Sequence, residues 1–310
     1  MGEFMSDCVL NEIKLKEPKS FEEQVEILKS RNMKIENKSN AIKILKTTNY
    51  YRITAYALQF KTENGYTDKA TFDTMYRLYK FDKRLRHIIL EILESIEISL
   101  RTYMAYHLSI KYGAEAQKNE HVFKNNDYYK GYNDFNGNHH KGLLEEIRNE
   151  INKNRKELFV KHHINKYNGH FPIWVVVELF SFGMLSKTYM NLKLENQKQI
   201  AKNCFNINYK LLESWLSNLS YIRNICAHYG RLYNKKMTIT PMIHNKYKKD
   251  DIILNRLFIS ILAIKELTKN MPEWTTFKIQ LEALIHEYID VVDLELIGFP
   301  SNWSEILSRN

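Results

Sequence analysis

"TFDTMYRLYKFDKRLRHIILEILESIEISLRTYMAYHLSIK", residues 71 to 111, is the longest regular stretch in this chain of 310 residues. Its apolar side chains return to one face at the 3.6-residue period of an α-helix, and neither Pro nor Gly interrupts the pattern. The stretch predicts one long helix, and a break near Asp82 is compatible with it. Glu97 and Arg101 are four residues apart on this helix, so they can form an ion pair.

Shorter helical patterns lie on both sides of this stretch. Ser20 and Glu23 have the spacing of a capping box at a helix start. The segment 49–60 fits either a strand or a helix. A helix loosened at Gly183 is expected after Pro172, and further amphipathic helices are expected at about 209–229, 250–270 and 275–292.

These patterns predict an all-α protein, a single domain over residues 1–310 with no internal repeats. Residues 112–170 are rich in Asn, Lys, His and Gly, and we interpret them as a polar surface insertion. The low numbers of Gly and Pro, 10 and 5, also favour helices over a sandwich or a barrel. Residues 1–4 are typical of a vector-derived leader that precedes a start at Met5.

The charge balance favours a polyanionic partner. Lys and Arg outnumber Asp and Glu by 46 to 36, a net charge of +10, which indicates nucleic acid before a membrane surface. A lysine-rich solubilising surface explains the same balance equally well.

The cysteines and the hydropathy pattern indicate in which cellular compartment the protein is expected. Cys8, Cys204 and Cys226 are far apart and lack the spacing of a zinc site, which favours a reducing compartment. No apolar run approaches the roughly 18 residues of a membrane span, and no signal-peptide core is present. We therefore predict a cytoplasmic protein without a metal site.

The helix expected at 209–229 carries "YIRNICAH", in which three polar residues are not needed for packing. Its apolar stripe consists of Leu211, Leu212, Trp215, Leu216, Leu219, Ile222 and Cys226, and Gly230 is a natural C′ residue. Asn224 and His228 share a face, whereas Arg223 and His228 are about 140° apart on an ideal helix. Arg223 and His228 could meet only if the long arginine side chain reached around the helix, if the last turn were distorted, or if one of the two came from a second subunit.

These residue types fit phosphoryl transfer on RNA. Arginine binds phosphate through a planar, permanently charged fork, and histidine exchanges protons near neutral pH. The ribose 2′-OH supplies the nucleophile, so the reaction requires no metal. A symmetric homodimer would place two such sets in one cleft. Candidate contacts to the RNA backbone follow the motif, and these are Arg231, Lys235, Lys236, Lys246, Lys248 and Lys249.

Three other interpretations of the motif stay open at this point. Arg223 and His228 can be a surface pair and a satisfied core histidine at a helix end. The basic residues can hold a small RNA without cutting it. The three polar residues can also form an interface network in a purely structural helical dimer.

The stretch "YIRNICAHYGRLYN" resembles the signature of the Abi-like (AbiD/AbiF) abortive-infection proteins, which contain an R-x4-H motif of the HEPN ribonuclease type. Five flanking blocks follow the family's order, and these are "SFEEQVEIL", "NYYRITAYALQF", "YKFDKRLRHIIL…IEISLR", "FPIWVVVELFSFGMLSKTY" and "IGFPSNW". The resemblance implies a HEPN-like helical bundle with additional N- and C-terminal helices, and a metal-independent endoribonuclease without a cofactor. It also implies bacterial defence against phage, by RNA cleavage or RNA binding; some members are associated with a small structured non-coding RNA.

The resemblance assigns roles to particular residues of this chain. Arg223 and His228 match the catalytic pair of the motif, and Asn224 matches its polar companion. Many members carry a second histidine where this chain has Tyr229, which removes an auxiliary proton donor. HEPN toxins often carry H-x-Y, whereas this chain has Gly230 two residues after the histidine, so their partner chemistry is not expected here.

The remaining candidates are interpreted as structural. Glu178 stands alone in an apolar segment and is expected to be buried and paired with Arg52 or Arg101. The other residues expected to serve the core or a solvated loop are His139, His140, His162, His163, Tyr50, Tyr51, Tyr56 and Cys226. For the tyrosines, stacking on RNA bases stays an alternative.

Overall fold

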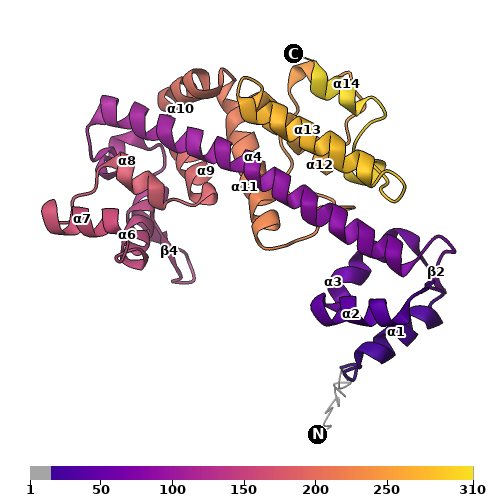
Figure 1. Ribbon diagram of the computed structural model, residues 1–310. Coiled ribbons are helices and arrows are strands. Elements are labelled where there is room, and N and C mark those ends of the chain that lie inside the picture. Colours follow the sequence, from indigo (N-terminus) through magenta and orange to yellow (C-terminus); the bar gives the residue numbers. More distant parts are fainter. Residues whose placement is uncertain (1–14, 310) are drawn as a thin grey trace, which may run out of the picture. The chain divides into compact units, whose positions relative to one another are not determined.

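The computed structural model describes residues 15–309, and helices dominate them (Figure 1). Fourteen α-helices in this range are joined by short 3-10 turns, by one π-helical turn at Ala201–Phe205 and by two hairpins of two strands each, so the all-α prediction is confirmed. The expected leader at residues 1–4 and Cys8 lie outside the described residues. The described residues divide into two compact units, and the boundary lies between Tyr79 and Lys80.

The first unit consists of short elements around a small core. They are α1 (Phe21–Ser30), α2 (Lys38–Thr47), α3 (Tyr50–Thr54), β1 (Lys61–Thr62), β2 (Gly65–Tyr66) and the start of α4 (Phe72–Tyr112). The Ser20 side chain accepts from the Glu23 amide at 3.1 Å while the Glu23 carboxylate accepts from the Ser20 amide, which confirms the capping box. Segment 49–60 is helical, with Tyr56 buried and Tyr51 75% exposed.

The long helix predicted at 71–111 is present as α4, and it is unbroken at Asp82. A carboxylate in the middle of a helix can compete for backbone amides and break the helix. The Asp82 carboxylate is instead fully buried and accepts hydrogen bonds from a distant loop, so it does not disturb its own turn.

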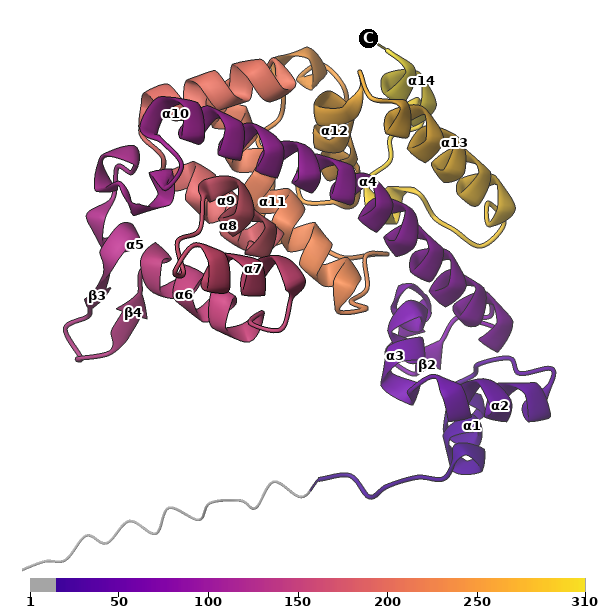
Figure 2. The same cartoon turned by 60° about the vertical axis from the view of Figure 1, so that its left-hand side comes forward.

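The second unit holds the rest of α4 and the remaining elements (Figures 1 and 2). These are α5 (Asn126–Lys130), β3 (Gly131–Asn133), β4 (His139–Lys141), α6 (Leu143–Lys153), α7 (Leu158–Lys166), α8 (Ile173–Val176), α9 (Phe182–Asn191), α10 (Leu194–Ile200), α11 (Tyr209–Ala227), α12 (Leu257–Thr268), α13 (Pro272–Glu287) and α14 (Trp303–Ser308).

The segment expected as a polar insertion combines exposed and packed parts. The β3–β4 hairpin is largely exposed. Leu143, Ile147 and Val160 of α6 and α7 are buried, and Phe123 pairs with Leu192 through an isolated β-bridge. The segment therefore contributes apolar side chains to the core of the second unit.

The helix expected after Pro172 is divided earlier than Gly183. Phe180 is extended, with ψ 131°, and the Ser181 hydroxyl caps α9 by accepting from the Met184 amide at 3.2 Å. The Phe180 carbonyl accepts from the Arg101 guanidinium at 2.7 Å. A serine cap and a remote arginine thus set the break, and Gly183 lies inside the first turn of α9.

The helix α12 is buried on all sides and carries a buried cation, Lys265. Its Nζ donates to the carbonyl of Ile306 at 2.8 Å and to that of Arg309, which fastens α14. Burial lowers the pKa of the Lys265 ammonium to about 8, and the neighbouring charge of Lys246 adds to this effect.

This pKa predicts a pH dependence of stability. Between about pH 8 and 10.5 the unfolded chain holds a proton on Lys265 that the folded chain has released, so the free energy of unfolding rises with pH in that window. We expect the advantage of wild type over Lys265→Met to grow there by about 1 to 3 kcal/mol, measured by urea unfolding. A difference that stays constant with pH would contradict the assignment.

Candidate functional site

The helix α11 places the motif, and its packing follows the predicted stripe. Leu212, Trp215, Leu216, Leu219, Ile222 and Cys226 are buried, while Leu211 is half-buried. The Asn208 side chain caps the start by accepting from the Lys210 amide at 2.8 Å. In Figures 1 and 2, α9 lies beside α11, and these two helices pack extensively.

The C-terminal end of α11 differs from the prediction by one residue. Tyr229, not Gly230, takes the left-handed C′ position, with φ 58°. The Gly230 amide donates to the Ile225 carbonyl at 2.7 Å and the Tyr229 amide to the Cys226 carbonyl at 3.1 Å, which is a Schellman motif. Glycine is needed at 230 because a Cβ there would lie 2.9 Å from Cγ2 of Ile225. Left-handed backbone at a tyrosine costs about 1–2 kcal/mol, so the turn beside His228 is strained.

The three motif residues lie at this helix end. Asn224 and His228 are exposed, and Arg223 is half-buried. His228 is the C-cap residue, with φ −93° and ψ 18°, so it has left the α-helical path. Within residues 15–309 the side chains of these three residues form no hydrogen bond, either with one another or with other groups.

Arg223 is electrostatically coupled to α4. Burial raises the pKa of the Glu97 carboxyl, while the positive charges of Arg101 and Arg223 oppose that shift. Glu97 also pairs with Arg101 at 2.5 Å, which confirms the predicted ion pair. The charge of Arg223 therefore acts on a buried carboxylate that is already paired with Arg101.

Glu178 does not pair with Arg101. Arg101 donates to the carbonyls of Val177 and Phe180, at 3.1 and 2.7 Å, and Glu178 is exposed. Glu178 forms no ion pair within the described range, so the expectation of a buried Glu178 paired with Arg52 or Arg101 is wrong. The short 3-10 turn at 177–179 directs its side chain outward, which helical periodicity could not predict.

A buried carboxylate fixes the chain that follows the motif. The amides of Leu232 and Tyr233 donate to Asp82 at 3.1 and 2.8 Å, and Arg86 forms an ion pair with the same carboxylate. Asp82 and Arg86 are 0% and 3% exposed. Sequence reasoning missed this pair, although its signal was present: both residues are on the apolar face of α4, beside Leu85.

The chain then runs back along α11. The Asn218 carboxamide donates to the Ile239 carbonyl at 2.6 Å, and the Trp215 indole donates to the Met242 carbonyl at 2.7 Å. The Met242 amide donates to the Ser214 hydroxyl at 2.8 Å. Since later residues contact earlier turns of the helix, this segment is antiparallel to α11.

This path separates the six basic residues that follow the motif. Arg231, Lys235 and Lys236 stay near the motif end, whereas Lys246 and Lys248 line a groove with Asn208 and Lys210 at the other end. With 19 residues, α11 is roughly 28 Å long at 1.5 Å per residue. The predicted basic contacts are thus divided between two ends of one helix; Lys249 lies next to the second set.

A groove of about 660 Å³ borders the motif and adds basic residues that sequence reasoning missed. Ser217, Ser220, Tyr221 and Asn224 of α11 line one side, and Ser181, Met184 and Lys187 line another. Lys141 and Lys153 also face it, and Lys153 pairs with Glu150 at 2.6 Å. No local signal could have grouped these lysines, because they come from three separate segments.

The other candidates have structural surroundings. Cys226 is 2% exposed, and burial raises the pKa of its thiol to about 12, which agrees with the expected core role. His139 contacts Glu145 at 2.8 Å, and His140 stacks on Tyr132 with ring centres 4.6 Å apart. Residues 15–309 contain no group of three or more His, Cys, Asp or Glu side chains able to hold a metal ion.

None of the described helices combines the length and the apolar character needed to cross a lipid bilayer.

A comparison with protein families assigns the chain. The family model described as "Abi-like protein" matches residues 43–234, more than half of the sequence, and this range ends just after the motif. The chain belongs to the Abi-like family. Membership associates this Abi-like protein with abortive infection, the defence of bacteria against phage. No curated protein and no solved structure is significantly similar to the chain.

The Asp82 contacts predict a large effect of its removal. Asp82→Ala leaves Arg86 buried without its carboxylate and two backbone amides without an acceptor, which costs about 3–5 kcal/mol. We expect lower stability in chemical unfolding and faster hydrogen exchange at Leu232 and Tyr233. Asp251→Ala, at an exposed position, serves as the control and should change neither. Unaltered exchange at the two amides in Asp82→Ala would contradict the assignment.

Proposed function

We propose that this Abi-like protein is a metal-independent endoribonuclease of the HEPN type that acts in abortive infection. One observation carries the proposal: Arg223, Asn224 and His228 occupy the last turn of a helix whose packing depends on other residues, and their side chains form no hydrogen bonds within residues 15–309. Polar groups that packing does not use are available to a ligand.

The chemistry follows from the residue types. The 2′-OH of RNA attacks the adjacent phosphorus, the bond to the 5′-oxygen of the next nucleotide breaks, and the products are a 2′,3′-cyclic phosphate and a 5′-OH. Arg223 binds the phosphate and stabilises its developing charge, and Asn224 orients the phosphate or the imidazole. His228 exchanges the proton of the 2′-OH or of the leaving oxygen.

A homodimer completes this site in the proposal. Each chain offers one histidine, whereas the reaction moves one proton from the nucleophile and one to the leaving group. Two copies of the α11 end across a two-fold axis would supply both, and would also remove the need to bring Arg223 and His228 of one chain together.

A second candidate is a defence protein that binds a small structured RNA without cutting it. The groove beside Asn224 supports it, because Lys141, Lys153 and Lys187 line that groove together with Glu146 and Glu150, and lysine ammonium groups bind phosphates as point charges. The candidates differ in their products and not in their ligand.

Substitution of the motif residues tests the proposed activity. We expect Arg223→Ala and His228→Ala each to lower the rate of RNA cleavage by about 100-fold or more, because each removes one transition-state interaction. Wild type should cleave in the presence of EDTA and leave 2′,3′-cyclic phosphate ends, read by sequencing of the RNA termini.

Matched controls exist on the same chain. Arg155→Ala and His162→Ala alter an exposed arginine and an exposed histidine that neither belong to the motif nor line the groove beside it, and both variants should keep wild-type rates. RNA cleavage by the double variant Arg223→Ala, His228→Ala would contradict the nuclease proposal. Tight, salt-sensitive RNA binding by wild type without products would favour the second candidate.

Mixing the two inactive variants tests the shared cleft. If Arg223 of one chain works with His228 of the other, a heterodimer of Arg223→Ala and His228→Ala keeps one such pair, although it lacks the second histidine of the cleft. Half of randomly formed dimers are mixed, and each mixed dimer keeps one of its two pairs. We therefore expect co-expression of the two variants to restore cleavage in part, to at most about a quarter of the wild-type rate. Each variant expressed alone is the control, and a mixture as inactive as both would argue against a site shared between chains.

A further inference from the structure

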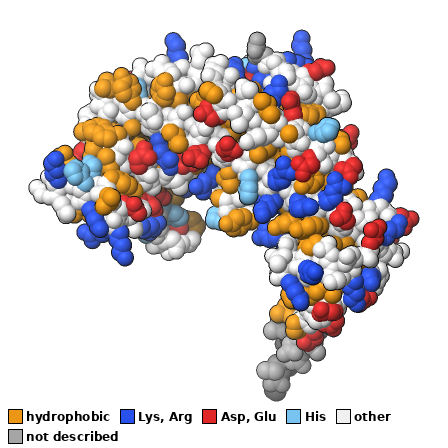
Figure 3. Space-filling model, in the orientation of Figure 1, with side chains coloured by type: hydrophobic (Ala, Val, Ile, Leu, Met, Phe, Trp, Pro, Cys, Tyr) orange, Lys and Arg blue, Asp and Glu red, His pale blue; other side chains and the backbone are white. Residues whose placement is uncertain are grey.

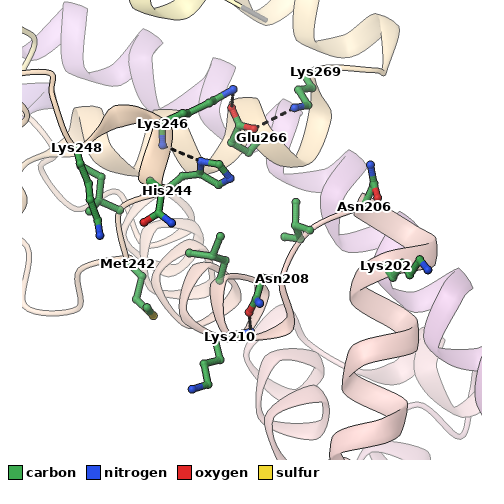
Figure 4. A pocket seen from close by; sticks show the side chains of 14 residues that line it. Lys202, Asn206, Asn208, Lys210, Met242, His244, Lys246, Lys248, Glu266 and Lys269 are labelled. Carbon is green, nitrogen blue, oxygen red and sulfur yellow. Dashed lines mark hydrogen bonds and ion pairs between the residues drawn. The ribbon is translucent and has the colours of Figure 1, made fainter.

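A second groove lies at the opposite end of α11 from the motif, and it has a strong local excess of positive charge (Figure 4). Its volume is about 1010 Å³. Five lysines and one glutamate are the charged residues that line it, namely Lys202, Lys210, Lys246, Lys248, Lys269 and Glu266. On the face in Figure 3, by contrast, basic side chains are interspersed with acidic and apolar ones.

The lysines of this groove fall into two groups. Lys246 and Lys269 hold the buried Glu266 carboxylate at 2.6 and 3.1 Å, and the Tyr247 hydroxyl donates to it at 2.6 Å. Burial alone would raise the pKa of the Glu266 carboxyl, but these hydrogen bonds together lower it, so the glutamate is charged and internally neutralised. It does not compete for the other lysines.

Lys202, Lys210 and Lys248 form the second group. All three are exposed, and none forms an ion pair within residues 15–309. Figure 4 shows them on different sides of the opening, each on a separate chain segment. Separated ammonium groups fit several phosphates along a chain better than they fit a single anion, which would require them to converge.

The wall between the lysines suits a nucleotide. Met242 is 51% exposed at the groove, and half-buried Ile243 and Leu211 add apolar surface against which a base or ribose can pack. The His244 ring accepts from the Lys246 amide through Nδ1 at 3.2 Å, so its Nε2 carries the proton and is a donor. Burial lowers the pKa of this imidazole, which favours its neutral form.

The groove is connected to the motif by one stretch of chain. The segment that runs antiparallel to α11 carries Arg231, Lys235 and Lys236 near the motif, and its continuation carries Lys246 and Lys248 into the groove. The length of α11, roughly 28 Å, matches about 8 stacked nucleotides at 3.4 Å per nucleotide.

We infer that the groove bounded by Lys202, Lys210 and Lys248 is a second binding site for single-stranded RNA, which holds the strand about 8 nucleotides from the phosphate at the motif. The inference rests on RNA being the ligand of the proposed function, but it does not depend on cleavage. It makes RNA length a determinant of affinity.

The test is binding of single-stranded 2′-O-methyl oligouridylates, which lack the nucleophile, in lengths from about 4 to about 16 nucleotides. Wild type should gain affinity once the length passes about 8 nucleotides. The triple variant Lys202→Ala, Lys210→Ala, Lys248→Ala should lose roughly tenfold or more in affinity for the long oligomers and little for the short ones. Its slope of log affinity against log salt should fall by about 2, since three phosphate contacts are lost.

A control variant carries the same change of charge. Lys156→Ala, Lys161→Ala, Lys166→Ala removes three exposed lysines in and before α7 and should bind every length as wild type does. Equal losses in both variants, or wild-type length dependence in the groove variant, would overturn the inference even if the protein cleaves RNA. A selective loss in the groove variant would support it even if the protein never cleaves, in which case the nuclease proposal alone fails.

Discussion

The second unit depends most on the hydrogen bonds and the ion pair of the buried Asp82 carboxylate. It has no exposure to solvent, and it accepts from the amides of Leu232 and Tyr233 while pairing with Arg86. A buried charge is tolerated only when such partners replace its hydration. This need for partners joins the first third of the long helix α4 to a loop 150 residues later, directly after the motif.

That anchor sets the course of the chain beyond α11. Once Leu232 and Tyr233 are fixed, the following residues return along the helix and satisfy the polar groups of Asn218 and Trp215. The arrangement leaves the Arg-Asn-His turn at one end of α11 and brings Lys246 and Lys248 to the other. A helix of 19 residues thus acts as a spacer between two polar surfaces.

Local rules predicted much of this architecture. Helical periodicity predicted α4, the stripe of α11 and the helices α12 and α13, because a 3.6-residue pattern depends only on neighbours in sequence. The same rules misplaced two helix boundaries, one through a remote side chain and a local cap, and the other through local backbone hydrogen bonds. Arg101 and the Ser181 cap moved the helix break away from Gly183, and the Schellman bonds placed Tyr229 in the position expected for Gly230.

The sequence by itself determined the helical class and the α11 helix. It also nominated Arg223, Asn224 and His228 as candidate site residues, since packing left those three side chains unexplained. Only the tertiary structure decided how the charged residues are grouped. Glu178 proved exposed, Asp82 proved buried, and Lys202 lines the same groove as Lys248. The physical reason is that a charge is stabilised by whichever partners the folded chain brings near, and sequence distance does not limit which partners those are.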